Sequence, residues 1–266
     1  MNQGQNIYFY HKEEPEIFPK LHSLCELANK NGFTVVNNTK DAHIIISFGD
    51  DGTFLQAIRN TGFCEDCLYV SVSTSSKPGF YTDVPLQDVA KLIDAIKSDQ
   101  IEVLHNPTIE VTIDNQASYF CLNEFSIQSA IVKTFVMEVF IDQLHFETFR
   151  GDGFIVSTPT GSTGYNKSVH GAVVDPRIPC MQITELGSLN NNYYRTLGSP
   201  FILSDGHVLT LIVVKEGNEH PTMAMDNDAL SIRHVEKIQI KLSGKKIKTI
   251  KLKDNSFWEK VRRNFL

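Results

Sequence analysis

Two carboxylates flanked by glycines form the stretch of the chain best suited to chemistry. This stretch, Gly49-Asp50-Asp51-Gly52-Thr53, follows the short apolar run from His43 to Ser47, with Phe48 between them. Glycines let the backbone turn sharply and approach a ligand, and the amino terminus of a following helix offers unpaired N–H groups to an anion such as phosphate. A carboxylate beside a phosphate either holds a metal ion or takes the proton of an attacking hydroxyl. The turn therefore indicates phosphoryl transfer, with a solvent-exposed Asp-Asp-Gly turn as the alternative.

A second polar stretch is rich in hydroxyl groups and glycines. It comprises Arg150-Gly151-Asp152-Gly153 and, after a short apolar run, the segment from Thr158 to Ser168. Hydroxyls and open amides in one loop can bind the oxygens of a nucleotide, and Tyr165 offers a flat face or a hydroxyl to a base. We interpret this stretch as a nucleotide-binding loop; the alternative is a Ser/Thr-rich surface loop.

A third candidate is the pair Asn123-Glu124, which interrupts an otherwise apolar segment. A carboxylate accepts two O–H donors, so this pair is suited to gripping two sugar hydroxyls. The alternative is an exposed polar pair at the end of a strand, which is a common arrangement.

The residues from 1 to 99 predict an α/β domain that positions the acidic turn. Short apolar runs alternate with segments whose apolar residues recur at helical spacing, which is typical of βαβ units and a mostly parallel sheet. Ligands of such sheets bind at the carboxyl ends of the strands, where the acidic turn lies. Thr53 is expected to cap the helix that follows. The expected strands are 6–10, 33–36, 43–47 and 68–73, and the expected helices include 15–30 and 84–98.

Residues 100–250 show alternating strands with few helical periods, which predicts an antiparallel sandwich or a related all-β domain. The expected strands are 108–114, 119–128, 135–140, 145–150, 154–158, 201–203, 208–214 and 235–242. Residues 251–266 predict a short helix that packs back on another element, because Ser256 and Glu259 have capping-box spacing. The expected fold class is therefore α/β plus all-β.

Charge and composition exclude several classes of protein. The net charge of −6 argues against general nucleic-acid binding, which needs a basic face. The amino terminus lacks the layout of a signal peptide and no apolar run is long enough to span a membrane, so we expect a cytoplasmic protein without a membrane partner. The five cysteines are expected to be reduced, with Cys64 and Cys67 in an inert loop. The nine histidines offer no metal pair, and we expect no metal held by the protein alone.

Taken together, the three polar stretches resemble the NAD kinase family over nearly the whole chain, and they look most like the short bacillus-type enzymes. The acidic turn is similar to the family's G-G-D-G-T, and Asn123-Glu124 to its N-E pair. Residues 150–153 and 158–168 are similar to its G-D-G and T-P-T-G-S-T-A-Y segments. The first motif is shared with diacylglycerol, sphingosine and phosphofructo-kinases, whereas the long segment is much more specific.

The resemblance implies a fold and a reaction. The fold is an N-terminal Rossmann-like or phosphofructokinase-like α/β domain followed by a C-terminal β-sandwich-like domain, with the dinucleotide in the cleft between them. The reaction moves the terminal phosphate of ATP, or of polyphosphate, to the 2′-hydroxyl of the adenosine ribose of NAD, giving NADP. The resemblance further implies Mg²⁺ carried transiently with the nucleotide, and a homodimer or homotetramer.

The resemblance also implies the site residues. Asp51 would be the catalytic base that takes the proton of the 2′-hydroxyl. Asn123 and Glu124 would hold a ribose or the adenine of the dinucleotide, and Asp152 a polar end of it. The other binding residues implied are Gly52, Arg150, Thr163, Gly164, Tyr165, Asn166, Lys167, Ser168, Gly187 and Asn227.

Some positions depart from the family pattern. Gly164 and Gly187 stand where the family has other small residues, which enlarges the pocket, and residues 74–80 match the family's N-x-G-x-L-G-F only loosely. Asp50 stands where the family has glycine. A second carboxylate about 4 Å from ATP phosphates would cost up to ~4 kcal/mol at an effective dielectric near 20. Two interpretations follow: an active NAD kinase, or a dinucleotide-binding protein whose kinase activity is weak or lost.

Overall fold

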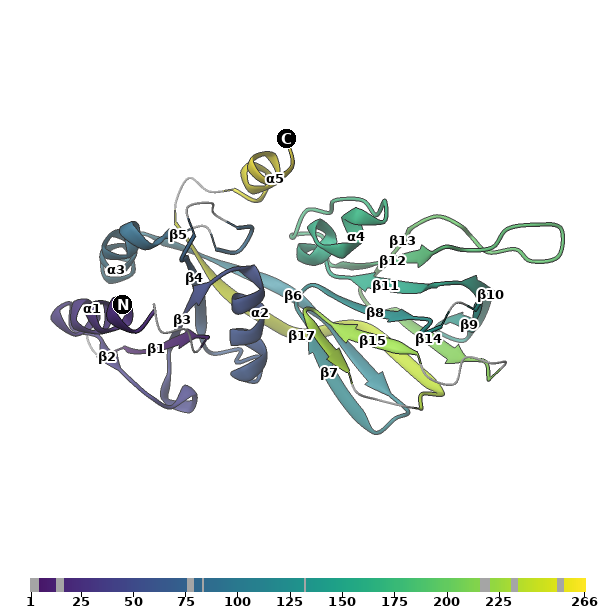
Figure 1. Ribbon diagram of the computed structural model, residues 1–266, viewed down its shortest axis with the longest axis horizontal. Coiled ribbons are helices and arrows are strands. Elements are labelled where there is room, and N and C mark those ends of the chain that lie inside the picture. Colours follow the sequence, from purple (N-terminus) through teal and green to yellow (C-terminus); the bar gives the residue numbers. More distant parts are fainter. Residues whose placement is uncertain are drawn as a thin grey trace. The chain divides into compact units, whose positions relative to one another are not determined.

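The chain forms two compact units (Figure 1). This computed structural model describes residues 5–12, 17–75, 79–82, 84–131, 133–215, 221–230, 234–252 and 256–266. Unit 1 comprises Met1–Asn106 with Ile247–Leu266, and unit 2 comprises Pro107–Lys246. Two long strands, β6 (Ile101–Ile113) and β17 (Lys237–Leu252), contribute residues to both units.

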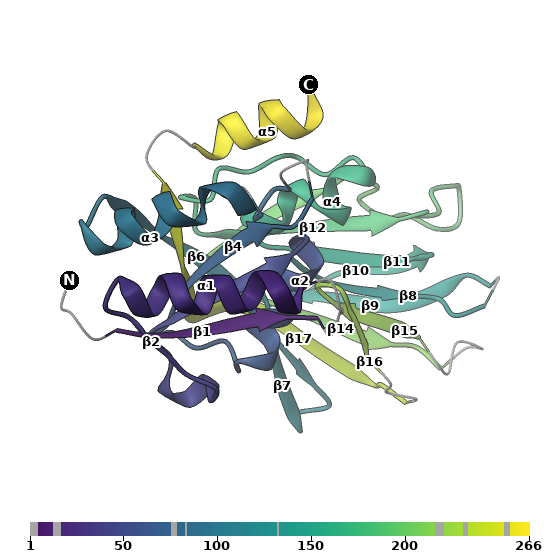
Figure 2. The same cartoon turned by 60° about the vertical axis from the view of Figure 1, so that its left-hand side comes forward.

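Unit 1 contains a parallel sheet with helices on both faces. Ile44 and Ile46 of the middle strand belong to the core under α1 and α3, while the equally buried Ile45 points to the opposite face by strand alternation. α1 and α3 accordingly cover one face of this sheet and α2 the other (Figure 2). The strands are β2 (Thr34–Val35), β1 (Asn6–His11), β3 (Ile44–Gly49), β4 (Leu68–Ser73) and β5 (Val84–Pro85), and the helices are α1 (Phe18–Lys30), α2 (Asp51–Asn60) and α3 (Val89–Lys97).

The helix expected at 84–98 is shorter than its sequence pattern indicates. Val84 and Pro85 instead form an edge strand that pairs with the end of β4, and a 3-10 turn, η2 (Leu86–Asp88), precedes the helix. Proline lacks a backbone N–H and suits a sheet edge better than a helix interior, so α3 starts only at Val89. Among the helices that the described residues form, none is long and apolar enough to cross a membrane.

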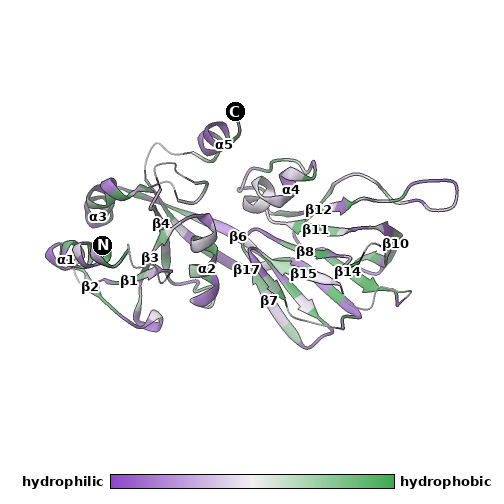
Figure 3. Ribbon diagram, viewed as in Figure 1, coloured by the Kyte–Doolittle hydropathy of each residue, from purple (hydrophilic) through white to green (hydrophobic). Residues whose placement is uncertain are grey.

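Unit 2 is a sandwich of two antiparallel sheets around one apolar core. Phe149 and Phe154 meet in this core from the two sheets, with ring centroids 4.3 Å apart. Figure 3 shows the apolar residues along these strands. The expected class, α/β plus all-β, is confirmed. One sheet has the order β13 (Phe201–Ser204), β12 (Cys180–Leu186), β11 (Gly153–Ser157), β8 (Glu124–Gln128), β15 (Thr222–Met225), β16 (Asp228–Leu230); the other includes β10 (Leu144–Gly151), β9 (Phe135–Ile141), β14 (Val208–Val213), β17 and the hairpin of β6 with β7 (Ala117–Cys121).

The expected C-terminal helix is present as α5 (Phe257–Phe265). Ser256 caps it, and the reciprocal bond between Glu259 and the backbone of Ser256 completes the predicted capping box. The helix lies against a segment of unit 1, because the ring of Phe257 contacts the ring of Phe80 edge-on with centroids 5.6 Å apart.

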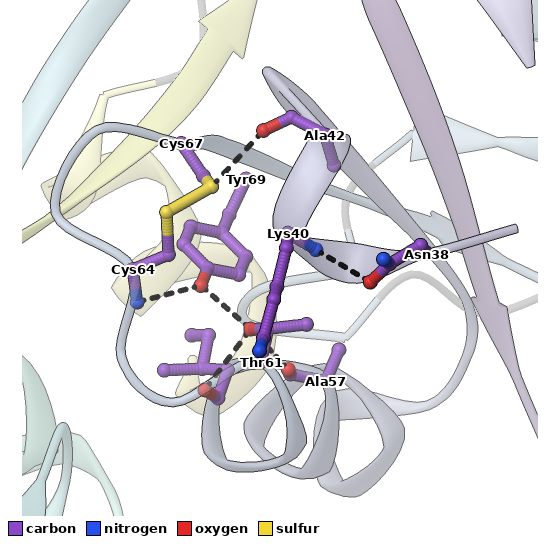
Figure 4. The surroundings of a disulfide bond; sticks show 9 residues. Asn38, Lys40, Ala42, Ala57, Thr61, Cys64, Cys67 and Tyr69 are labelled. Carbon is purple, nitrogen blue, oxygen red and sulfur yellow. Dashed lines mark hydrogen bonds between the residues drawn. A yellow bond between two sulfur atoms is a disulfide. The ribbon is translucent and has the colours of Figure 1, made fainter. Parts of the chain in front are cut away.

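Cys64 and Cys67 form a disulfide, so the expectation that all cysteines are reduced is wrong. A separation of three residues brings the two Cα atoms to 5.5 Å, which is within the range for a disulfide. Figure 4 shows that the bridge lies beside Tyr69, whose hydroxyl accepts from Cys64 N at 3.1 Å and contacts the hydroxyl of Thr61 at 2.7 Å. The bridge therefore lies within the loop that connects the end of α2 to the start of β4.

Candidate active site

The acidic turn lies where β3 ends and α2 begins. Gly49 has a φ of 150°, and a Cβ there would collide with the side chain of Thr53, so the turn needs a glycine at this position. Asp51 and Gly52 occupy the first turn of α2. Backbone N–H groups at the start of a helix have no partner within the helix, which favours an anion there.

Asp50, rather than the expected Thr53, caps α2. Asp50 Oδ1 accepts hydrogen bonds from the hydroxyl and the backbone N of Thr53, both at 2.7 Å. The hydroxyl bond is the main cause that lowers the pKa of the Asp50 carboxyl, and the backbone bond and Lys12, whose Nζ lies 3.8 Å away, add to it. The extra carboxylate therefore has a structural role, because it satisfies a donor of the first helical turn.

Asp51 is held by residues 79–82, which we call the 79–82 turn. Its Oδ1 accepts hydrogen bonds at 2.9 Å from Tyr81 N, Thr82 N and the Thr82 hydroxyl. Its Oδ2 accepts one from Phe80 N at 2.7 Å. The carboxylate therefore has a fixed orientation at the amino terminus of α2. Of the loosely matching segment 74–80, residues 76–78 lie outside the described residues.

In unit 2, the strand expected at 119–128 is divided into β7 and β8 at Asn123. The break is stabilised by Asp226, whose carboxylate accepts hydrogen bonds from the backbone N of Leu122, Asn123 and Glu124 at 3.2, 2.6 and 3.3 Å. These N–H groups are bound to a carboxylate instead of a neighbouring strand, so the chain bends. Asp226 was not predicted from the sequence; its position in a turn beside the predicted Asn227 was the available signal.

Glu124 lies at this bend as a buried acid. Its side chain is 8% exposed, and its Oε2 has no hydrogen-bond partner among the described residues. Burial, with a smaller contribution from the charge of Asp226, raises the pKa of Glu124 to about 8. Gly164 lies beside it, since a Cβ at Gly164 would be 2.9 Å from Oε2. The space that the missing methyl leaves is therefore partly occupied by Glu124. At neutral pH the neutral carboxyl both donates and accepts, which suits a sugar hydroxyl.

The hydroxyl-rich loop packs directly on the bend. Thr158 N donates to Asn123 O at 2.8 Å, and a Cβ at Gly161 would collide with the Asn123 backbone. Two hydroxyls that were expected to bind nucleotide oxygens donate within the loop: Ser162 to Pro159 O at 2.6 Å and Thr163 to Thr160 O at 3.1 Å. The Thr158 hydroxyl donates to Leu122 O at 2.5 Å, and the buried Thr160 hydroxyl has no hydrogen-bond partner among the described residues. The loop contains η3 (Thr160–Thr163) and α4 (Tyr165–Ser168).

Side chains of α4 divide into one that holds the loop and others that face outward. Asn166 is fully buried: its Nδ2 donates to Ser162 O at 3.3 Å and its Oδ1 accepts from Thr184 at 2.8 Å. Tyr165 is exposed, and its hydroxyl accepts from Gln128 Nε2 at 3.2 Å. Lys167 and Ser168 are exposed as well. Asn166 therefore holds the loop, whereas the side chains of Tyr165, Lys167 and Ser168 are exposed to solvent.

Arg150, Asp152 and Gly187 form a second group in unit 2. The guanidinium of Arg150 lies over the ring of Tyr194, 4.4 Å from its centroid. Gly187 has a φ of 55°, and a Cβ there would collide with the carboxylate of Asp152. As at Gly164, a carboxylate occupies the space beside the glycine, and the backbone conformation is a further reason for glycine.

Comparison with known proteins decides the family. The model for the ATP-NAD kinase C-terminal domain matches residues 122–252. NAD kinase 2 of Bacillus subtilis is 61% identical over 265 residues, which cover 100% of this chain and 99% of that protein. The chain belongs to the NAD kinase family. NAD kinase 2 of Geobacillus kaustophilus is 57% identical, covering 99% of each chain.

Solved structures of this family share the fold. Yeast NADH kinase complexed with NADH has a TM-score of 0.83 at 17% identity, covering 99% of this chain and 87% of its own. An NAD kinase from Archaeoglobus fulgidus in complex with ATP has a TM-score of 0.77 at 21% identity, covering 97% and 99%. For this member of the NAD kinase family, the predicted residues divide between the units: Asp51 and Gly52 belong to unit 1 and the others to unit 2.

Proposed function

We propose that this protein is an NAD kinase that transfers the terminal phosphate of ATP to the 2′-hydroxyl of the adenosine ribose of NAD, giving NADP. The full-length identity to proteins named NAD kinase 2 supports the activity. The observation that carries the chemistry is the Asp51 carboxylate, oriented by four hydrogen bonds at the amino terminus of α2.

In the proposed reaction, Asp51 accepts the proton of the 2′-hydroxyl. The 2′-oxygen bonds to the γ-phosphorus, the bond from that phosphorus to the bridging oxygen breaks, and ADP leaves with the electron pair. Because the transition state of phosphoryl transfer is loose, the protein mainly has to position groups, and one oriented carboxylate suffices as the base.

Unit 2 is proposed to bind the dinucleotide. Asn123 and Glu124 hold ribose hydroxyls or the adenine, with Asp226 fixing the backbone between them. Thr163, Gly164, Tyr165 and Ser168 contact the adenosine portion, and Arg150 and Lys167 contact phosphate. The same resemblance assigns contacts with the dinucleotide to Gly52, Asp152, Gly187 and Asn227, whereas Asn166 contributes by holding the loop that carries Tyr165.

Mg²⁺ is proposed to enter with the nucleotide. Within the described parts of the chain, no group of three or more His, Cys, Asp and Glu side chains is placed to hold a metal ion. Single carboxylates fit a cation that is bound mainly by substrate phosphates, as Mg²⁺ commonly is. Its chemistry there would be to neutralise phosphate charge. Polyphosphate is an alternative donor, because it contains the same anhydride bond as ATP.

The assembly and location proposed from the family resemblance are a homodimer or homotetramer in the cytoplasm. Size-exclusion chromatography with light scattering would measure the assembly. The alternative of a dinucleotide-binding protein without transfer rested on Asp50, and no observation favours it, since that carboxylate is accounted for as the cap of α2.

The activity is tested by incubating the purified protein with NAD, Mg²⁺ and either ATP or polyphosphate, and then detecting NADP with a strictly NADP-dependent dehydrogenase. We expect NADP with ATP, and the polyphosphate arm decides whether that donor is also used. Asp51→Asn is the matched control, since amide and carboxylate have the same shape. Absence of NADP from the parent protein with both donors would contradict the proposal, and calorimetry with NAD would then test binding without transfer.

A further inference from the structure

The hydrogen bonds to Asp51 are unevenly divided between its two oxygens. Oδ1 accepts three, from Tyr81 N, Thr82 N and the Thr82 hydroxyl, whereas Oδ2 accepts one, from Phe80 N. A carboxylate has about four lone-pair sites, two on each oxygen. Oδ1 is therefore saturated, and among the described residues only Oδ2 keeps a lone pair without a donor.

The 79–82 turn is built to fit this carboxylate closely. Thr82 is 1% exposed, and its hydroxyl accepts from Gly79 N at 3.1 Å while donating to Asp51. A Cβ at Gly79 would collide with both Asp51 Oδ1 and the Thr82 hydroxyl. The buried hydroxyl thus joins the start of the turn to the carboxylate, and the glycine makes the close approach possible.

The turn is held from two sides within unit 1. On one side, the ring of Tyr81 stacks on Phe54 of α2 with centroids 4.9 Å apart. On the other side is α5, where Phe257 contacts Phe80 and the Arg263 guanidinium donates to Gly79 O at 3.1 Å. A chain of direct contacts therefore runs from α5 through the turn to Asp51.

We propose that the 79–82 turn and α5 position Asp51 so that Oδ2 is the atom that takes the proton of the attacking hydroxyl. Thr82 and Arg263 are positioning residues, because they act on the reaction through Asp51 and its turn. This inference rests on the proposed kinase function. It goes further by assigning distinct tasks to the two oxygens and by giving the C-terminal helix a part in catalysis. The proton moves from the hydroxyl oxygen to Oδ2, while the bonds to Oδ1 keep the carboxylate from rotating.

The first test compares Thr82→Val, Thr82→Ser and the parent. Valine removes the donor to Asp51 and keeps the shape, so we expect kcat to fall roughly 10- to 100-fold, as for the loss of a hydrogen bond to a charged group. KM for NAD and for ATP should stay within about twofold. Serine keeps the hydroxyl and should restore most of kcat. Thr61→Val is the matched control, because Thr61 carries a partly buried hydroxyl at the opposite end of α2.

The second test addresses α5 with Arg263→Ala and its neighbour Arg262→Ala as control. Arg263 acts one contact further from the reaction, so we expect a smaller fall in kcat, about 3- to 10-fold, again with little change in KM. Among the described residues, the Arg262 side chain makes no hydrogen bond to the 79–82 turn, and the Arg262→Ala variant should keep the parent's kcat. Calorimetric titration with NADP should give the parent's stoichiometry for each variant, which shows that the loss of rate is not a loss of folded protein.

The outcomes separate the inference from the proposed function. If the parent makes no NADP, the kinase function fails. If the parent is active but Thr82→Val keeps its kcat, or if serine fails to rescue it, the assignment of Thr82 is wrong. Equal losses in the Thr61 and Thr82 variants would also overturn it, since they would reflect general destabilisation. Parent-like activity of Arg263→Ala would remove α5 from the proposal.

Discussion

Each unit holds a carboxylic acid among its predicted site residues, Asp51 in unit 1 and Glu124 in unit 2, and these two acids are held in opposite ways. In unit 1, Asp51 accepts four hydrogen bonds from one turn. In unit 2, Glu124 is buried beside a second acid, and one of its oxygens has no partner among the described residues. At Glu124, burial and the like charge of Asp226 favour a neutral carboxyl, whereas at Asp51 the four hydrogen bonds fix the direction of the carboxylate. The same functional group is thereby suited to a base in one unit and to a ligand for sugar hydroxyls in the other.

Replacing each of the two acids by its amide should give the largest difference in kcat. Asp51→Asn removes the proton acceptor, so we expect kcat to fall about 10²- to 10⁴-fold. Glu124→Gln replaces a carboxyl that is already neutral at pH 7 by a neutral isostere, so its kcat should fall by less than about 10-fold. Steady-state rates of NADP formation at pH 7 measure both. Equal losses in the two variants would show that Glu124 acts as a charged group.

The pH dependence of the free energy of unfolding should report the protonation of Glu124. The pKa of Glu124 is about 8 in the folded protein against 4.5 for an ordinary glutamate side chain, so between these pH values the folded state holds a proton that the unfolded state has released. Stability should therefore fall as pH rises through this window, by about 1.4 kcal/mol per pH unit at most.

Urea unfolding of the parent and of Glu124→Gln between pH 5 and 8 tests this slope. The variant should lose the part that Glu124 contributes. Burial also raises the pKa of Glu147, to about 7, so the parent's total slope includes that residue and only the difference between the two proteins is informative. Parallel stability curves for parent and variant would mean that Glu124 titrates normally.

The smallest changes in stability and turnover are expected for variants of Asp50. They test whether this carboxylate is a helix cap or an inhibitory charge. Asp50→Ala removes the N-cap of α2 and should lower the free energy of unfolding by about 1 kcal/mol, while Asp50→Gly should cost only a few tenths. Turnover of both variants should stay within about threefold of the parent. A sharp rise in turnover of Asp50→Gly would instead support the interpretation that Asp50 represses transfer.

Much of the fold followed from the sequence because local patterns were strong. The strand expected at 68–73 is β4, the strands expected at 135–140 and 145–150 pair as β9 and β10, and the capping box of α5 is formed. Periodicity and capping are local properties, and they need no knowledge of distant contacts. The family resemblance then supplied the candidate residues, whose ligand contacts stay predictions.

What the sequence did not predict depends on contacts between distant residues. The break between β7 and β8 arises because Asp226, about a hundred positions away, accepts the N–H groups of residues 122–124. Thr82 meets Asp51 from thirty-one positions along the chain, two residues after a segment, 74–80, that matched the family only loosely. The disulfide was missed because a lone C-x-x-C has no distinctive setting. Neither composition nor spacing reports such partners.

Helix α2 is fastened at both ends. At its start the 79–82 turn binds Asp51, and at its end Thr61 contacts Tyr69 of β4 beside the Cys64–Cys67 bridge. Contacts at both ends oppose fraying of the helix, so the amide protons of its hydrogen-bonded interior should exchange with deuterium more slowly than those of a helix with free ends. An anion arriving at its amino terminus would meet donors that are already ordered, and little entropy would be lost in arranging them.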